Sequence, residues 1–298
     1  SWRLGAALRT GPEAFHALSA GGDNGHVPLP DGIASINYTY RGYGYPLGAM
    51  IPEEQYLHGA QIFASGMGNR PCRRMLVILP MAHIFTLVGC IWAPLLHGMS
   101  TVLLNSVHPR KVFETVERFG VDFVTAVPEL LRFFAGVAGT GSEREGGATA
   151  RAGREPATRG AARTRALDAV DIVASGGSTL TAEDYHSITE RFGVELLHGY
   201  GLTEFTPVSR NIRETARPGT VGPPGEGVEC RIVEASPETG VGEIAVRAPS
   251  MTHGYFREPD LTADAFRDGW FLTGDYGRFD DGHLVFVSEK KRTCKVNG

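Results

Sequence analysis

The sequence predicts an α/β fold, with a mainly parallel sheet core and helices on both faces, followed by a smaller β-rich subdomain. Runs rich in apolar residues, such as Met75–Leu79 and Val121–Val127, alternate with helical segments such as Pro109–Phe119. Strands of a parallel sheet are buried on both faces, so they are apolar without alternation. Later in the chain, short alternating strands replace this pattern. We therefore expect the α/β core in residues 1–218 and the β-rich subdomain in residues 219–298.

Composition limits the classes of function. The chain has 298 residues, of which 42% are hydrophobic and 21% charged, with a formal net charge of -4. This charge gives no general attraction to nucleic acid or to an anionic membrane. No apolar run reaches the roughly 20 residues needed to cross a bilayer, and the four cysteines lack Cys-x-x-Cys spacing. We expect a cytoplasmic protein with reduced thiols, no cysteine metal site, no nucleic-acid partner and no membrane span.

The core is expected to alternate between strand and helix. After a helix and a loop in residues 1–29, the predicted elements are strand Ile33–Tyr40, helix Ile51–Gly66, strand Met75–Leu79, helix Leu87–Gly98, strand Thr101–Leu104, helix Pro109–Phe119, strand Val121–Val127, helix Pro128–Val137, strand Val170–Ala174, a helix from about Thr181, and strand Val194–Leu197. The segment Leu87–Gly98 is apolar all round, which predicts a buried helix. Glu183 and Asp184 suit the first turn of the helix that opens near Thr181.

Two further regions complete the expected organisation. Gly139–Arg165 contains no Val, Ile, Leu or aromatic residue, which predicts a disordered surface insertion. The β-rich subdomain is expected to contain strands Val228–Val233, Gly242–Arg247 and Leu284–Val287.

A Gly-rich loop follows the first predicted strand. Ile33, Ala34 and Ile36 indicate the end of a buried strand, and Gly42, Gly44, Pro46 and Gly48 follow closely. Such a loop exposes backbone N–H groups that suit phosphate oxygens, although an ordinary Gly-rich turn has the same composition. It is not a Walker-type loop, because Ala49 follows Gly48 and no Lys-Ser/Thr pair closes it.

Three later motifs resemble a known family. Leu197–Glu204, Gly269–Asp275 and Lys295–Gly298 resemble, in this order, segments of the adenylate-forming ligases, which include acyl-CoA synthetases and adenylation domains. Against that family's phosphate loop, the chain matches at Tyr38, Thr39, Gly44, Pro46 and Gly48, and departs at Tyr40, Arg41, Gly42, Tyr43 and Leu47. The resemblance covers Asp31 to Gly298 and implies the fragment of the large N-terminal domain that precedes a separate C-terminal domain.

The resemblance implies a two-step reaction in one site. A carboxylate attacks the α-phosphate of Mg-ATP to give an acyl-adenylate, and a thiol of coenzyme A or a carrier phosphopantetheine then displaces AMP. Tyr200 would stack on adenine, Thr203 would meet the α-phosphate, Glu204 would bind Mg²⁺, and Asp275 would accept the ribose hydroxyls. The implied catalytic residues are Thr203 and Glu204; the implied nucleotide-binding residues are Thr39, Gly42, Gly44, Gly177, His198, Gly199, Tyr200, Gly201, Thr203 and Asp275; the implied substrate pocket holds His83, Ser175 and Gly176; and the implied hinge residue is Lys295.

Some of these positions have simpler interpretations. His83 also suits a half-buried loop histidine, and Ser175–Ser178 also suits a plain turn from strand to helix. The partners implied by the resemblance are a small carboxylic acid and, as a thiol carrier, an acyl carrier protein.

The departures from the family pattern concern the cations that hold the triphosphate. Leu47 stands at the loop lysine, Glu289 at a ribose-contacting arginine and Arg292 at the hinge aspartate. The chain has only four lysines, and none lies near Leu47. Adenylation depends on charge neutralisation of the phosphates. We expect an acyl-activating ligase impaired in adenylation, with Arg41 as the candidate substitute cation; the alternative is a non-catalytic descendant that binds nucleotide or acyl-adenylate, or a scaffold.

Overall fold

The computed structural model describes residues 30–41, 45–68, 72–138 and 170–289. Contacts divide the chain into two compact units, Ser1–Ile33 and Ala34–Gly298. In the first unit, the N–H of Ile33 donates to the carbonyl of Pro30 at 3.2 Å. Three predictions lie outside the described residues: the N-terminal helix and loop, the insertion Gly139–Arg165, and the hinge segment with Lys295.

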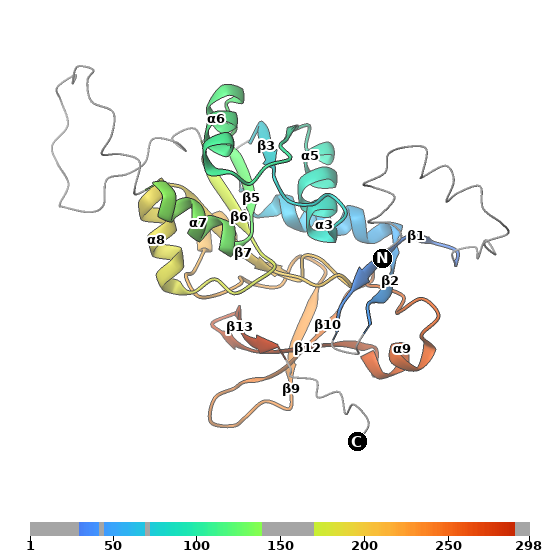
Figure 1. Cartoon of the computed structure of the whole chain (residues 1–298). Coiled ribbons are helices and arrows are strands. Elements are labelled where there is room, and N and C mark those ends of the chain that lie inside the picture. Colours follow the sequence, from blue (N-terminus) through green and yellow to red (C-terminus); the bar gives the residue numbers. More distant parts are fainter. Residues whose placement is uncertain (1–29, 42–44, 69–71, 139–169, 290–298) are drawn as a thin grey trace, which may run out of the picture. The chain divides into compact units, whose positions relative to one another are not determined.

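A six-stranded sheet forms the α/β core (Figure 1). Its strands, in spatial order, are β4 (Ser100–Leu103), β3 (Arg74–Val77), β5 (Phe123–Ala126), β6 (Ile172–Ser175), β7 (Glu195–Tyr200) and β8 (Ser209–Arg210). The first five strands run parallel and β8 runs antiparallel to β7. The prediction of a mainly parallel sheet is therefore confirmed, with strand ends displaced by one to three residues.

Helices cover both faces of this sheet, as predicted. Met75 and Val77 of β3 belong to one hydrophobic cluster, whereas Leu76 belongs to the other, as the alternation of side chains along a strand requires. The first cluster includes residues of α3 (Glu53–Ser65), α4 (Ile84–Thr86), η1 (Leu87–Trp92) and α5 (Ala93–Leu96). The second cluster includes residues of α6 (Pro109–Phe119), α7 (Pro128–Ala138) and α8 (Ala182–Phe192).

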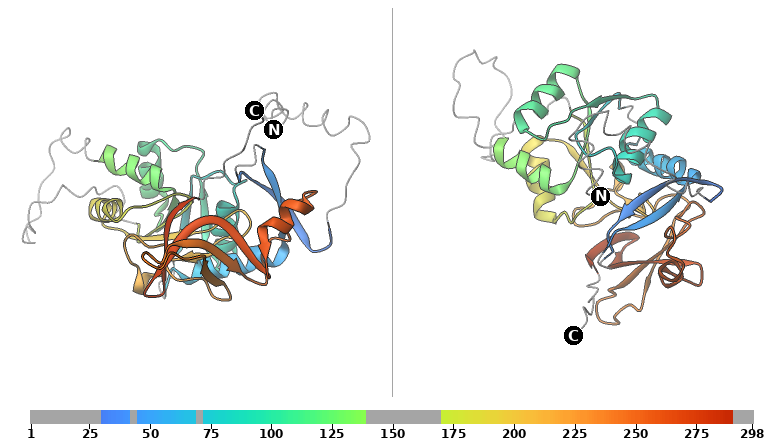
Figure 2. Two further views of the ribbon diagram at one scale, coloured as in Figure 1. Left: turned by 90° about the horizontal axis from the view of Figure 1, so that it is seen from below. Right: turned by 45° about the vertical axis from the view of Figure 1, so that its right-hand side comes forward.

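The first predicted strand is placed differently from the prediction. β1 (Ile33–Thr39) pairs with β2 (Leu47–Pro52) in a separate two-stranded sheet, so the Gly-rich segment leads to a strand and not directly to a helix. β1 is largely half-exposed because β2 is the one strand paired with it in the described part of the chain, and the prediction of a buried strand is wrong. β2 is held from its other side, where Met50 N donates to Gly254 O at 2.9 Å. Figure 2 shows β2, in blue, beside the orange segment that contains Gly254.

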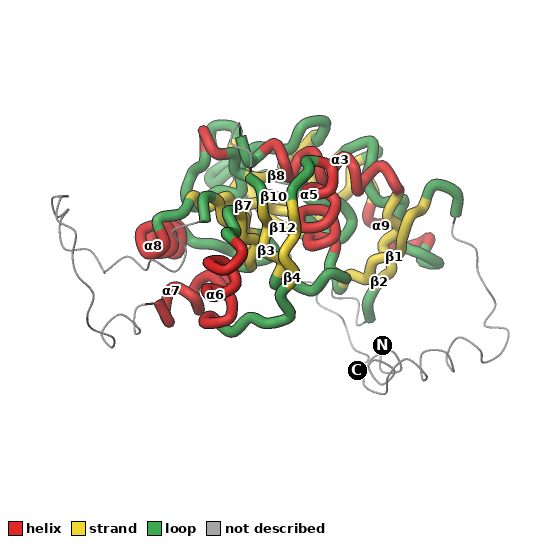
Figure 3. The backbone as a smooth tube through the Cα atoms, turned by 90° about the horizontal axis from the view of Figure 1, so that it is seen from above, coloured by secondary structure: helices red, strands yellow, loops and turns green. Residues whose placement is uncertain are grey.

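The apolar segment Leu87–Gly98 also differs from the prediction. It forms the π-helical turns of η1 and then α5, which lie along α3 (Figure 3). Trp92 is 38% exposed and Leu95 68% exposed, so the prediction of burial all round is wrong. One side of the segment packs on α3, and the side chains on the other side meet solvent, as single apolar residues on protein surfaces often do.

The second large sheet is the expected β-rich part. It has five strands in the order β11 (Phe266–Arg267), β12 (Trp270–Asp280), β10 (Gly242–Arg247) and β9 (Glu229–Val233), with β13 (His283–Glu289) also paired to β12. All its pairings are antiparallel. The short η3 (Arg213–Thr215) precedes this sheet and α9 (Pro259–Ala265) leads into β11. Buried residues of both large sheets join in one hydrophobic cluster, and the boundary at residues 218 and 219 stays a prediction. Among the described residues, no helix is both long and apolar enough to cross a bilayer.

Candidate active site

A cavity of about 750 Å³ opens where the parallel strands of the core end. Five regions of the second compact unit line it: the end of β1, the loop after β6, β7 with the loop that follows it, the segment Gly219–Val221, and strands β12 and β13. The carboxyl ends of strands are where open α/β sheets usually bind ligands. The sequence folds this way because each parallel strand must turn at that edge before the chain returns through a helix.

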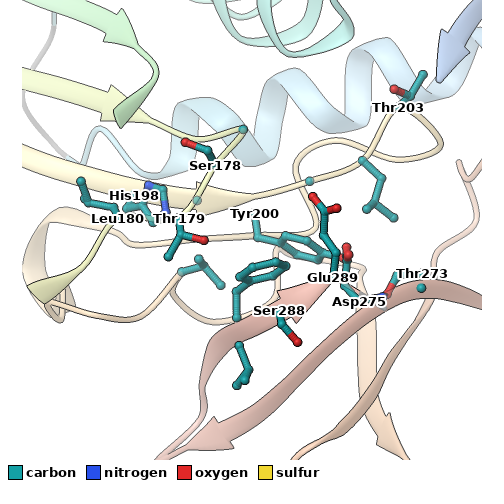
Figure 4. A pocket seen from close by; sticks show the side chains of 18 of the residues that line it. Ser178, Thr179, Leu180, His198, Tyr200, Thr203, Thr273, Asp275, Ser288 and Glu289 are labelled. Atoms are coloured by element: carbon teal, nitrogen blue, oxygen red, sulfur yellow. The ribbon is translucent and has the colours of Figure 1, made fainter. Parts of the chain in front are cut away.

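Tyr200 and Asp275 meet in this cavity, although they lie on different sheets (Figure 4). The hydroxyl of Tyr200 donates to Asp275 Oδ2 at 2.6 Å, and the two side chains are largely buried. The Tyr200 ring packs on Phe286, with 5.9 Å between ring centroids. The hydrogen bond fixes the carboxylate of Asp275 beside the aromatic ring.

The charge of Asp275 depends on its surroundings. Burial raises the pKa of its carboxyl to about 6, and the negative charge of Glu289, its partner across the β12–β13 ladder, acts in the same direction. The hydrogen bond from Tyr200 acts in the opposite direction, because it stabilises the carboxylate. Asp275 therefore titrates close to neutral pH.

Arg41 is buried against the side of this cavity. Its Nη1 donates to the Tyr255 hydroxyl at 2.6 Å and lies 3.4 Å from Glu204 Oε1. Its Nη2 donates to the carbonyls of Leu272 and Thr273 at 2.9 and 2.8 Å. Tyr255 also donates to Glu204 Oε1 at 2.6 Å. The guanidinium thus neutralises Glu204 and joins the end of β1 to both large sheets.

One carboxylate oxygen of Glu204 is already engaged by neighbouring side chains. Oε1 of Glu204 already accepts from Tyr255 and faces the guanidinium of Arg41, whose positive charge would repel a metal ion. The described residues contain no group of three or more His, Cys, Asp or Glu side chains suited to a metal. A Mg²⁺ ion at Glu204 would require Arg41 to leave first.

Small residues shape the wall between β6 and β7. Gly177 has a φ of +86°, which side chains other than glycine rarely adopt. At Gly201, an added Cβ would come within 2.5 Å of Thr206 Oγ1, so the backbone packs there without a side chain. His198 lies in the same wall, and burial lowers its pKa to about 4, so its ring is neutral at pH 7.

A second cavity of about 160 Å³ adjoins the first. Both cavities are lined by Gly177, Tyr200 and Thr203, together with other residues of Gly199–Leu202. Residues that line only the second are Phe63, His83, Ile84, Phe85, Ala174, Ser175, Gly176, Leu197, Thr206, Pro207 and Arg210. His83 also accepts the N–H of Phe85 at 3.2 Å as the N-cap of α4, so it serves the local structure as well.

The two cavities bring most of the sequence-predicted site residues together. The first is lined by Thr39, Gly177, His198, Gly199, Tyr200, Gly201, Thr203, Glu204 and Asp275, and the second by His83, Ser175 and Gly176. Gly42, Gly44 and Lys295 lie outside the described residues. Their individual roles toward a ligand stay predictions.

Two residues of the site escaped the sequence analysis. Tyr255 was not singled out, because its contact with Glu204 depends on how the two large sheets meet. Arg210 belongs to no motif, and its burial is a tertiary property. The one signal in the sequence was the position of the charged Arg210, only two residues after the apolar Val208.

Comparison with known proteins identifies the family. A family model described as AMP-binding enzyme matches residues 7–256 of this chain. The chain belongs to the AMP-binding enzyme family. Its relatives include the sulfoacetate–CoA ligase of Cupriavidus necator, 26% identical over 279 residues, which are 91% of this chain and 50% of the relative. They also include a probable CoA ligase, CCL8, of Humulus lupulus, 30% identical over 276 residues, which are 89% of this chain and 44% of the relative.

Solved structures of this AMP-binding family share the fold. ATP-bound MatB from Rhodopseudomonas palustris superposes with a TM-score of 0.73 at 22% identity, over 93% of this chain and 52% of that one. The α/β class with a separate antiparallel sheet is therefore confirmed. The AMP-binding chain spans about half the length of the curated relatives it matches.

Proposed function

We propose that this AMP-binding chain is part of an acyl-activating ligase of the CoA-synthetase type that binds acyl-adenylate but is impaired in forming it. In the complete reaction, a carboxylate oxygen bonds to the α-phosphorus of ATP and pyrophosphate leaves. A thiolate then bonds to the acyl carbon and AMP leaves. The proposal separates these steps because they depend on different residues.

Recognition of the AMP part is supported by side chains that meet in the first cavity. Asp275 presents a carboxylate to a ribose diol, and Tyr200 holds that carboxylate in place through its hydroxyl. Thr203 lines both cavities, which suits a hydroxyl at the junction between acyl group and α-phosphate. These contacts need no cation for the β- and γ-phosphates.

Impairment of adenylation is supported most directly by Arg41. The loop lysine of the family corresponds to Leu47, which is 1% exposed in the hydrophobic core and cannot reach a phosphate. Arg41, the candidate substitute, is engaged with Glu204, Tyr255 and two carbonyls. Loss of one charged contact commonly costs about 10² to 10³ in rate, and here the lysine and the metal carboxylate are both affected.

The proposed substrates follow from the relatives. The relatives are named as CoA ligases, so we propose a small carboxylic acid as the acyl donor and coenzyme A as the acceptor. The phosphopantetheine of a carrier protein is the other candidate acceptor. ATP or AMP is the proposed nucleotide. The second candidate function is a non-catalytic binder of acyl-adenylate or a scaffold, which the engaged pair of Arg41 and Glu204 also favours.

Two measurements on one preparation test the proposal. ATP–pyrophosphate exchange is measured across a panel of carboxylic acids, and binding of a non-hydrolysable acyl-sulfamoyl-adenosine is measured by titration calorimetry. We expect binding without exchange. Asp275→Asn should weaken binding, whereas Asp280→Asn, at the exposed end of the same strand, should not. Rapid exchange would contradict the proposed impairment of adenylation. If the analogue did not bind, the scaffold would remain as the candidate function.

A further inference from the structure

Arg210 is a buried cation in the wall of the second cavity. It ends β8 and is only 5% exposed. Its guanidinium lies over the ring of Phe63, 4.5 Å from the ring centroid, and against Gly66 at the end of α3. A Cβ on Gly66 would overlap the guanidinium, so this glycine makes room for the arginine. The fold therefore accommodates a positive charge at this place.

Among the described residues, the guanidinium of Arg210 has no anionic partner. Its Nε and Nη1 are buried and make no hydrogen bond, and the described residues offer it no ion pair. The buried Arg41, in contrast, has a carboxylate, a hydroxyl and two carbonyls as partners. A buried charge without a counter-charge is costly, and the ring of Phe63 offsets only part of this cost. Burial lowers the pKa of Arg210 to about 9, which leaves it protonated at pH 7.

A second unpartnered group lines the same cavity. Ser175 Oγ is buried without a hydrogen-bond partner among the described residues. Ser175 and Arg210 both line this cavity beside the rings of Phe63 and Phe85, and its described lining contains no carboxylate. Donors that remain unsatisfied in the free protein suit an acceptor supplied by a ligand.

The position and size of the second cavity indicate which part of a ligand it would hold. Thr203 borders both cavities, whereas Arg210 and Phe63 line the second alone. An acyl group whose carbonyl lies at Thr203 would thus direct its distal end toward Arg210. The volume of about 160 Å³ suits a group of about six non-hydrogen atoms, because a cavity of about 150 Å³ can hold benzene. Long fatty chains do not fit.

We propose that the second cavity selects short carboxylic acids whose distal end carries another anionic group, and that Arg210 is the residue that determines this specificity. The inference rests on the proposed function, because it assumes that the reacting end of the acid lies in the first cavity. An acid with an apolar end would fill the cavity but leave the guanidinium without a counter-charge. A site built around a charged group discriminates strongly against ligands that lack its partner.

The test compares two acyl-sulfamoyl-adenosines of similar shape. Their acyl groups are succinyl and 4-methylpentanoyl, which differ by a carboxylate in place of an isopropyl group. Titration calorimetry on the whole chain should show at least roughly tenfold tighter binding of the succinyl analogue, as expected for a hydrogen bond to a charged group. Equal binding, or tighter binding of the 4-methylpentanoyl analogue, would overturn the inference.

Variants assign the preference to Arg210. Arg210→Met should abolish or reverse it, Arg210→Lys should retain part of it, and the exposed Arg118→Met on α6 should leave it unchanged. Circular dichroism checks the fold of each variant, and Arg210→Gln replaces Arg210→Met if the latter does not fold. A preference that persists without the charge at residue 210 would refute the assignment.

Adenosine binding separates this inference from the proposed function. If adenosine binds and the two analogues bind equally, the specificity inference alone is wrong. If neither adenosine nor either analogue binds, the proposed function is wrong and the inference falls with it.

Discussion

At the scale of single residues, we expect the ionisation of Asp275 to make nucleoside binding depend on pH. Its carboxyl is buried beside Tyr200 and Glu289, and burial raises its pKa to about 6. A protonated carboxyl is a weaker acceptor for two ribose hydroxyls than a carboxylate. The charge state of this residue should therefore control nucleoside affinity near pH 6.

We predict that adenosine binding weakens as the pH falls through about 6. Adenosine carries no phosphate that would titrate in this range, so the dependence reports on the protein. Calorimetric titrations between pH 8 and 5 should give a midpoint near the pKa of Asp275. In Tyr200→Phe the midpoint should move to higher pH, since the hydrogen bond that favours the carboxylate is lost. A flat profile from pH 8 to 5 would contradict this prediction.

The same residue should limit stability. Because the pKa of Asp275 is higher in the folded chain than the ordinary aspartate value of 3.8, its ionisation opposes folding, and its contribution becomes less favourable as the pH rises from about 4 to 6. Asp275→Asn should raise the free energy of unfolding by about 3 kcal/mol at pH 7.5. The difference should vanish near pH 4, as measured by urea denaturation at both pH values.

Residue types in motifs were informative, but contacts between motifs were not. Tyr200, Thr203 and Asp275 were singled out from the sequence, and the structure places them in one cavity. The ion pair of Arg41 with Glu204 could not be predicted, because the two residues are 163 positions apart and the packing of two sheets brings them together. Arg210 could be predicted even less, because its guanidinium meets the ring of Phe63 only in the folded chain.

At the scale of elements, local signals placed the helices well. Thr181 and Asp184 form a capping box at the start of α8, with the Asp184 N–H donating to Thr181 Oγ1 at 3.1 Å. The predicted opening near Thr181 is correct for this reason. Pro109 at the start and Gly120 after the end of α6 likewise gave its predicted bounds.

We predict that Thr181→Ala lowers the free energy of unfolding by about 1 kcal/mol, because the first turn of α8 loses its side-chain acceptor. Ser187→Ala, an exposed change within the same helix, serves as the control and should cost nothing measurable. Chemical denaturation of both variants measures the difference. Equal effects of the two changes would show that the capping box contributes little.

Strands were harder to place where their neighbours were unknown. β2 was missed because Gly48 and Pro46 resemble a loop, and its burial comes from contact with Gly254, far along the chain. β12 was treated as a motif, since Gly274 and Gly277 interrupt its alternating pattern. Whether these two segments form strands depends on the strands they pair with, and the local sequence does not identify those partners.

At the scale of the whole molecule, one arginine connects distant parts of the second compact unit. Arg41 follows β1, Glu204 follows β7, and Thr273 belongs to β12. Both charged side chains are buried, so each depends on the other for compensation. The pair should therefore contribute to the cooperativity between the α/β core and the β-rich sheet.

A double-mutant cycle measures this coupling. We predict that Arg41→Met costs about 3 to 5 kcal/mol, because it leaves the buried Glu204 unpaired. The same change in a Glu204→Gln background should cost clearly less. The exposed pair Arg110 and Glu114 is the matched control, with an expected coupling below about 0.5 kcal/mol. Strict additivity at Arg41 and Glu204 would show that they act independently.

The burial of Leu47 bears on whether the adenylating step could be regained. A lysine returned to residue 47 would place an ammonium group in the hydrophobic core of β2, far from any aqueous phosphate. The packing around Leu47 therefore disfavours a lysine at this position. A new cation would have a shorter route from Tyr40, which is 69% exposed and already borders the large cavity. Engineering of a phosphate-binding cation should therefore begin at residue 40.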